Sequence, residues 1–76
     1  MREKIISILS GLRPEFDFSK PENFIDEGML DSFDIINLVS ALESSFNISI
    51  PGIDILPDNF SSVDSIENLL KKFGVR

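Results

Sequence analysis

The sequence predicts a small all-α bundle, and three observations lead to that prediction. Apolar residues recur at helical spacing in three segments, residues 3–13, 32–46 and about 62–73. All four prolines lie outside these segments, where they do not interrupt helical hydrogen bonds. The chain has 76 residues, enough for a single domain, 1–76, with a small core. Three main helices joined by long connections therefore make up the expected fold.

The first predicted helix covers residues 3–13. Its apolar residues follow the i, i+3, i+4, i+7 spacing of one helical face: Ile5, Ile8, Leu9 and Leu12. Pro14 disfavours helical geometry at the residue before it, so the helix should end at Arg13.

Residues 14–30 predict a long irregular loop. We expect the segment 19–22 to cap a single helical turn that runs to about Ile25. A connection of this length is unusual in a compact domain, but this one is rich in apolar residues. Six of its side chains should pack beneath the helices: Phe16, Phe18, Phe24, Ile25, Met29 and Leu30.

The second helix should begin at a serine. Asp31 suits the N-cap position, and Asp34 follows three residues later, as in a capping box. Ser32 is then the first helical residue, with its hydroxyl at the rim of the helix, and Asn47 is suited to end the helix. The expected apolar stripe of this helix comprises Phe33, Ile36, Leu38, Val39, Leu42 and Phe46.

The remaining residues predict a connector, a short turn and a last helix. Residues 48–50 should be extended with both isoleucines pointing inward, and Pro57–Phe60 should form a short helical turn. Ser61 and Asp64 have capping-box spacing before a helix that ends near Gly74. Its expected apolar face comprises Val63, Ile66, Leu69, Leu70 and Phe73.

Composition argues against several classes of function. Thirteen acidic and seven basic residues give a net charge of −6, which disfavours nucleic-acid binding and favours partners with basic surfaces. Cysteine and histidine are both absent, so the usual metal ligands and the commonest general base are missing. We therefore predict no catalytic and no metal-binding residues. Without an apolar run long enough to span a membrane, the expectation is a soluble, cytoplasmic protein.

The pattern of the second helix and its flanks resembles the acyl carrier protein family. The resemblance rests on the segment 31–34 (Asp-Ser-Phe-Asp), on Ala41-Leu42-Glu43 and Phe46, and on Ile48 and Ile50-Pro51. It extends from Ile5 to Phe73. It implies a four-helix bundle with a short third helix and a long loop between helices 1 and 2.

The resemblance also implies a cofactor and partners. Ser32 would receive covalent 4′-phosphopantetheine from coenzyme A through a phosphopantetheinyl transferase, which Asp31 would help to dock. The thiol of the arm would then hold acyl or aminoacyl groups as thioesters. A loading ligase and a downstream acyltransferase or synthase would be further partners, and a monomer is the simplest expectation. The residues expected to contact these partners are Phe33, Asp34, Val39, Ser40 and Glu43.

Two features separate the chain from the fatty-acid type of carrier. Asn37, Ser44 and Ser45 stand where fatty-acid carriers commonly have glutamates, and the connector that follows Ile50 is longer. The connector resembles that of stand-alone carriers of secondary metabolism, including aminoacyl and D-alanyl carriers loaded by an adenylating ligase. Fatty-acid or polyketide biosynthesis stays open as a pathway. An unmodified helical adaptor that binds other proteins is the alternative of another class.

Overall fold

The computed structural model describes residues 1–75 of the chain and contains three α-helices. These are α1 (Arg2–Leu12), α2 (Ser32–Phe46) and α3 (Val63–Lys72). Two short 3₁₀ turns, η1 (Gly52–Asp54) and η2 (Pro57–Phe60), lie between α2 and α3. The all-α prediction is confirmed, and the expected short third helix takes the form of these 3₁₀ turns. None of the helices in the described residues is long and apolar enough to cross a membrane.

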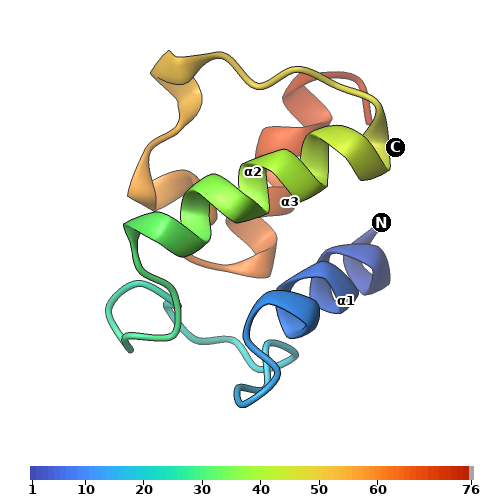
Figure 1. Cartoon of the computed structure of the whole chain (residues 1–76). Helices are drawn as coiled ribbons and strands as arrows, with labels where there is room; N and C mark the ends of the chain where they lie inside the picture. The colour runs from blue at the N-terminus through green and yellow to red at the C-terminus, as the bar shows by residue number, and fades with distance from the viewer. Residues whose placement is uncertain (76) are drawn as a thin grey trace.

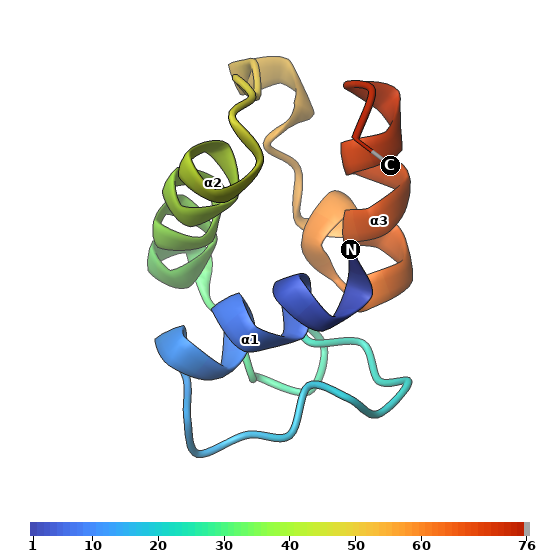
Figure 2. The ribbon, with the colours of Figure 1, turned by 90° about the vertical axis from the view of Figure 1, so that its right-hand side faces the viewer.

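The three helices surround a single core. In Figure 1, α2 crosses the centre of the molecule with α3 behind it and α1 below. Figure 2 shows α2 and α3 on opposite sides of the core, with α1 and the loop that follows it closing the lower end. The connector, residues 47–62, returns from the end of α2 along its length and delivers η2 beside the start of α2 (Figure 1).

Lys4 in α1 and Arg13, the residue just after α1, contact opposite ends of α2. The Lys4 ammonium donates a hydrogen bond of 3.0 Å to the Ser45 carbonyl and lies over the Phe46 ring. At the opposite end of α1, Arg13 reaches the first turn of α2. Because cations are favourable at helix C-termini, Lys4 also complements the dipole of α2. The register between α1 and α2 is therefore fixed at two points.

The predicted cap of α2 is confirmed. Asp31 is the N-cap, and its Oδ1 accepts a 2.9 Å bond from the Asp34 N–H. Asp34 Oδ2 in turn accepts a 3.1 Å bond from the Asp31 N–H, which completes the capping box. Asn47 closes the helix in the left-handed conformation, with φ of 56°.

The cap of α3 differs from the prediction. The N-cap is Ser62 rather than Ser61, and its hydroxyl accepts a 3.0 Å bond from the Ser65 N–H. Ser61 instead donates its hydroxyl to the Asp58 carbonyl in η2, so it belongs to the preceding turn. The predicted end of the helix is confirmed, since Gly74 has φ of 84°.

The long loop, residues 14–30, is fixed to the core by apolar side chains. Four of them are buried, Phe18, Phe24, Met29 and Leu30, while the predicted Phe16 and Ile25 pack partly buried against the core. The prediction that residues 19–22 cap a helical turn running to about Ile25 is wrong in its cap. The turn begins at Asn23, whose side-chain oxygen accepts hydrogen bonds from the N–H groups of Ile25 and Asp26.

The apolar stripe predicted for α2 needs one correction at its start. Phe33 and Ile36 are 70% and 64% exposed, whereas Ile35, absent from the prediction, is buried. Ile35 lies three and four residues before Leu38 and Val39, so these three side chains share one helical face. The helix carries more apolar residues than the core can cover, and tertiary packing decides which of them remain in solvent.

Candidate functional site

Ser32 is the first residue of α2 and is exposed. Within residues 1–75 its hydroxyl takes part in no hydrogen bond, because the capping role belongs to Asp31. A serine at a helix start usually serves as the cap itself. Here the hydroxyl is instead left available at the rim of the helix, beside the orphan N–H groups of the first turn.

The two aspartates on either side of Ser32 are held by Arg13. Its Nε donates a 2.9 Å hydrogen bond to Asp34 Oδ2, and its Nη2 lies 2.8 Å from the same oxygen. Nη2 also lies 3.4 Å from Asp31 Oδ2. Asp34 is only 7% exposed, and the Arg13 hydrogen bond is the main reason that the pKa of its carboxyl is lowered. The site therefore contains a charged network in addition to the serine.

Arg13 is a site residue that the sequence did not reveal. Its position after α1 and before Pro14 indicated only a helix end. One signal was available in the sequence. Asp34 lies at N3 of a helix that packs on the core, and a carboxylate that faces a core needs a cation or several hydrogen-bond donors as partners. Arg13 also lies 3.2 Å from Glu15 through Nη1. The network thus joins both ends of the long loop to the start of α2.

The residues predicted to contact partners occupy three different environments. Phe33 and Ser40 are exposed, as a docking role requires. Val39 and Asp34 are both buried, so these two side chains offer little surface to a partner. Glu43 is half-buried, and its carboxylate accepts a 2.8 Å hydrogen bond from the Ile50 N–H. The sequence assigned Val39 and Asp34 both a structural role and a partner role, and their burial favours the structural one. The bond of Glu43 to the connector is a structural contact that the sequence pattern did not predict.

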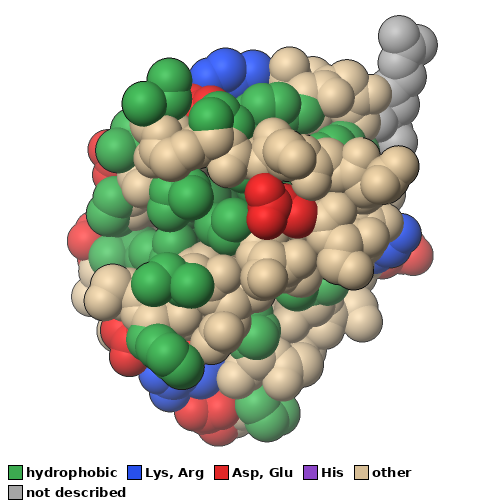
Figure 3. All heavy atoms as spheres, turned by 45° about the horizontal axis from the view of Figure 1, so that its top comes forward, with side chains coloured by type: hydrophobic (Ala, Val, Ile, Leu, Met, Phe, Trp, Pro, Cys, Tyr) green, Lys and Arg blue, Asp and Glu red, His purple; other side chains and the backbone are tan. Residues whose placement is uncertain are grey.

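Five large apolar side chains are exposed, and they form what we call the exposed apolar surface. Two come from the first half of α2 and three from the connector: Phe33, Ile36, Ile53, Ile55 and Leu56. Figure 3 shows hydrophobic side chains gathered on the side of the molecule where α2 begins and the connector descends. Large exposed apolar groups that cluster in this way are typical of interaction surfaces.

The exposed face of α2 carries no charge. Its exposed residues are Ser32, Phe33, Ile36, Asn37, Ser40, Ser44 and Ser45. The two acids of the helix, Asp34 and Glu43, are both engaged in internal hydrogen bonds. The fully exposed side chains of α2 are therefore uncharged, and the nearest exposed acid is Asp31, the N-cap residue just before Ser32.

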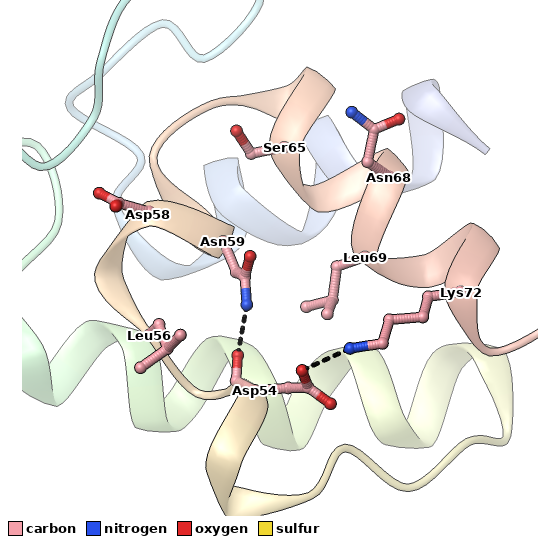
Figure 4. A pocket seen from close by; sticks show the side chains of 8 residues that line it. All are labelled: Asp54, Leu56, Asp58, Asn59, Ser65, Asn68, Leu69 and Lys72. Atoms are coloured by element: carbon pink, nitrogen blue, oxygen red, sulfur yellow. Dashed lines mark hydrogen bonds and ion pairs between the residues drawn. The ribbon is translucent and has the colours of Figure 1, made fainter.

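A groove of about 410 Å³ lies between the connector and α3 (Figure 4). Asp54 accepts a 2.7 Å bond from the Lys72 ammonium, and its backbone carbonyl accepts a 2.7 Å bond from the Asn59 amide. Leu56 and Leu69 supply apolar parts of the lining. The Lys72 ion pair ties the middle of the connector to α3, and the Asn59 bond joins η2 to η1 within the connector.

Comparison with known proteins agrees with this geometry. Residues 3–70 match the family described as "Phosphopantetheine attachment site". A curated relative, "Aminoacyl carrier protein 1" of Bradyrhizobium diazoefficiens, is 31% identical over 74 residues, which cover 92% of this chain and 81% of the relative. No solved structure shows a significant match. The cofactor that these matches imply is covalent 4′-phosphopantetheine, as the sequence predicted. The chain belongs to the acyl carrier protein family, the carriers that bear phosphopantetheine.

Proposed function

We propose that Ser32 is the residue that bears 4′-phosphopantetheine and that the protein carries thioester-linked groups between enzymes. The observation that supports this proposal most strongly is the exposed Ser32 hydroxyl, which makes no hydrogen bond within residues 1–75 at the first position of α2. Asp31 relieves this serine of the capping role and occupies the position implied for transferase docking.

The surroundings of Ser32 suit a phosphodiester. A helix N-terminus favours a negative group by about 0.3–1 kcal/mol through its dipole and its unpaired N–H groups. Asp31 and Asp34 oppose this effect through like charge, but Arg13 contacts both carboxylates and offsets it. Ser32 and the neighbouring Phe33 are both exposed, so a group attached to the serine would extend into solvent.

The attachment reaction requires a second protein. The Ser32 oxygen attacks the phosphorus of coenzyme A that bears pantetheine, an O–P bond forms, and adenosine 3′,5′-bisphosphate leaves as the P–O bond of the pyrophosphate breaks. The hydroxyl proton must pass to a base. The chain has no histidine, and both oxygens of Asp31 lie within hydrogen-bonding distance of other residues of the network. The transferase therefore supplies the base, and this chain supplies the positioned nucleophile.

We further propose an aminoacyl group or another small carboxylic acid as the cargo, loaded by an adenylating ligase. Support comes from the name of the curated relative and from the uncharged face of α2. A partner that recognised its carrier through basic residues would find no acidic side chain free on that face. The exposed apolar surface is the docking area that we propose for the ligase and the transferase, with Ser40 at its margin.

Mass spectrometry of the intact protein tests the attachment site. The unmodified protein is incubated with coenzyme A and a transferase of broad specificity, and we expect a mass gain of one phosphopantetheine. Ser32→Ala should show no gain, while Ser44→Ala, an exposed serine on the same helix, should be modified like the wild type. A wild type that gains no mass, or a Ser32→Ala protein that does, would contradict the proposal. An unmodified wild type would favour the adaptor alternative.

The cargo is tested on the modified protein. Adenylating ligases of the aminoacyl and fatty-acyl types are each supplied with ATP and their acids, and the thioester is detected by mass and by its release with hydroxylamine. We expect loading by an aminoacyl-type ligase. Efficient loading with a long fatty acid instead would exclude the aminoacyl assignment and leave the attachment site unaffected.

A further inference from the structure

We infer that Arg13 is a positioning residue for the modification of Ser32, an inference that rests on the proposed attachment site. Arg13 is not on α2 and is separated from Ser32 by the whole long loop. Its guanidinium nevertheless contacts the residue before Ser32 and the residue two positions after it. No other basic side chain contacts these acids within residues 1–75.

The contacts of Arg13 form a fixed geometry. Nε and Nη2 both approach Asp34 Oδ2, at 2.9 Å and 2.8 Å, and Nη2 lies 3.4 Å from Asp31 Oδ2. The fork-shaped guanidinium offers several donors in one plane, an arrangement that the single ammonium of lysine does not reproduce. Asp34 Oδ2 also accepts the Asp31 N–H, so the guanidinium and the capping box share one oxygen.

This shared oxygen links Arg13 to the orientation of Ser32. The capping box sets the backbone on both sides of the serine, because the Asp31 N–H and the Asp34 N–H are its two donors. Asp34 is buried as an anion and depends on a cationic partner to stay there. Without Arg13, the Asp34 carboxylate would turn towards water and the first turn of α2 would fray. The Ser32 hydroxyl would then no longer be held in a single orientation.

Arg13 also sets the charge beside the nucleophile. Asp31 and Asp34 place two negative charges around a hydroxyl that must approach the pyrophosphate of coenzyme A. The guanidinium contacts both carboxylates and cancels part of their field at short range. Both effects act on the attack of the hydroxyl rather than on the docking of the exposed apolar surface. We therefore expect Arg13 to affect kcat of the transferase more than KM for the carrier.

The experiment compares Arg13→Gln with a matched control, Arg2→Gln. Arg2 pairs with Asp64 and Glu67 of α3, so this control removes the same charge and a comparable pair of contacts away from Ser32. Arg13→Gln should lower kcat for phosphopantetheine transfer by about tenfold, the scale expected when a reacting group is misplaced. Arg2→Gln should stay within about twofold of the wild type, because its contacts do not reach α2. Helix content is checked by circular dichroism at the assay temperature.

Two further variants separate positioning from general stability. Arg13→Lys retains the charge but loses the fork, so we expect a kcat between those of the wild type and Arg13→Gln. Asp34→Asn removes the shared acceptor, and the double variant Arg13→Gln/Asp34→Asn should be no slower than the slower single variant. If Arg13→Gln fails to fold, a reduced kcat in folded Arg13→Lys supports the inference and a wild-type kcat overturns it.

The outcomes distinguish this inference from the proposed function. A folded Arg13→Gln protein with wild-type kcat, or an Arg2→Gln protein with the same loss, would overturn the role of Arg13 and leave Ser32 as the attachment residue. A wild type that gains no phosphopantetheine would overturn the proposed function itself.

Discussion

The two aspartates around Ser32 have different surroundings despite their identical chemistry. Asp34 is buried and accepts bonds from Arg13 and from the Asp31 N–H, and the Arg13 bond lowers the pKa of its carboxyl. Asp31 keeps 63% of its side chain exposed while it caps the helix. Asp34 is therefore a structural residue, and Asp31 is the acid of the pair that a partner can reach.

The lowered pKa of Asp34 predicts acid sensitivity. Its folded pKa lies below the unfolded value of about 3.9. The folded state thus binds fewer protons, so the stabilisation is fully present above about pH 4 and is lost as the pH falls through the folded pKa. Asp34→Asn should lower the free energy of unfolding by about 1–3 kcal/mol at neutral pH, because Arg13 loses its charged partner. On acidification, the free energy of unfolding of this variant should fall by less than that of the wild type.

Urea unfolding between pH 7 and pH 2.5 measures this difference. Asp26→Asn is the matched control, since the Asp26 carboxylate is exposed and accepts no hydrogen bond within residues 1–75. An Asp34→Asn protein with the same acid-induced loss as the wild type would assign the acid sensitivity to other carboxyl groups.

At the scale of the element, α2 separates its apolar residues onto two faces. Ile35, Leu38, Val39 and Leu42 are buried, while Phe33 and Ile36 lie in solvent next to the connector. These exposed apolar side chains do not contribute to the stability of the fold, because only a partner could bury them. The helix therefore holds the core with one face and offers an uncharged apolar face beside Ser32.

An uncharged docking face predicts weak salt dependence. KM of the transferase for this carrier should change by less than about twofold between 50 mM and 500 mM NaCl, since screening acts on charged contacts. Phe33→Ser and Ile36→Ser should each raise KM by about tenfold, as expected when a buried apolar contact is lost from an interface. Steady-state kinetics with varied carrier concentration gives both results.

The control for this prediction is Asn68→Ser, an exposed position on α3 with no part in the exposed apolar surface. It should leave KM unchanged. A KM that rises steeply with salt, together with wild-type values for Phe33→Ser and Ile36→Ser, would show that charged contacts elsewhere guide docking.

At the scale of the molecule, the long loop contributes as much to the core as a helix does. Phe18 and Phe24 are fully buried, and their rings meet edge to face with centroids 5.0 Å apart. The Phe24 N–H also donates a 2.6 Å bond to the Ser61 carbonyl, which joins the loop to the end of η2. The loop thus closes the end of the bundle beneath α1, the end from which Arg13 reaches α2.

The same substitution, Phe to Ala, should change stability strongly in the loop and very little at an exposed position of α2. Phe18→Ala should lower the free energy of unfolding by about 3–5 kcal/mol, because it leaves a cavity in a small core. Phe33→Ala removes the same atoms from an exposed position and should change stability by less than about 0.5 kcal/mol. Chemical denaturation followed by circular dichroism measures both, and equal losses would contradict the burial seen for the loop.

Sequence pattern was sufficient where the interaction is local. The capping box of α2, the left-handed Asn47 and Gly74 and the turn at Pro57 each depend on residues within a few positions of one another. The rim position of Ser32 follows from the same local geometry. The packing of the loop against the core could also be predicted, because burial of its phenylalanine side chains is favourable.

The rest depended on contacts between distant segments, which a single sequence does not record. It did not show that Arg13 reaches across the long loop to the acids beside Ser32, or that Ile35 rather than Phe33 and Ile36 faces the core. Nor did it show that the Glu43 carboxylate turns towards the connector, where it accepts the Ile50 N–H. The sequence by itself thus determined where α2 begins and which hydroxyl begins it, because backbone capping is a short-range effect. Only the tertiary structure decided which side chains surround that hydroxyl, because burial and ion pairing depend on how separate helices pack.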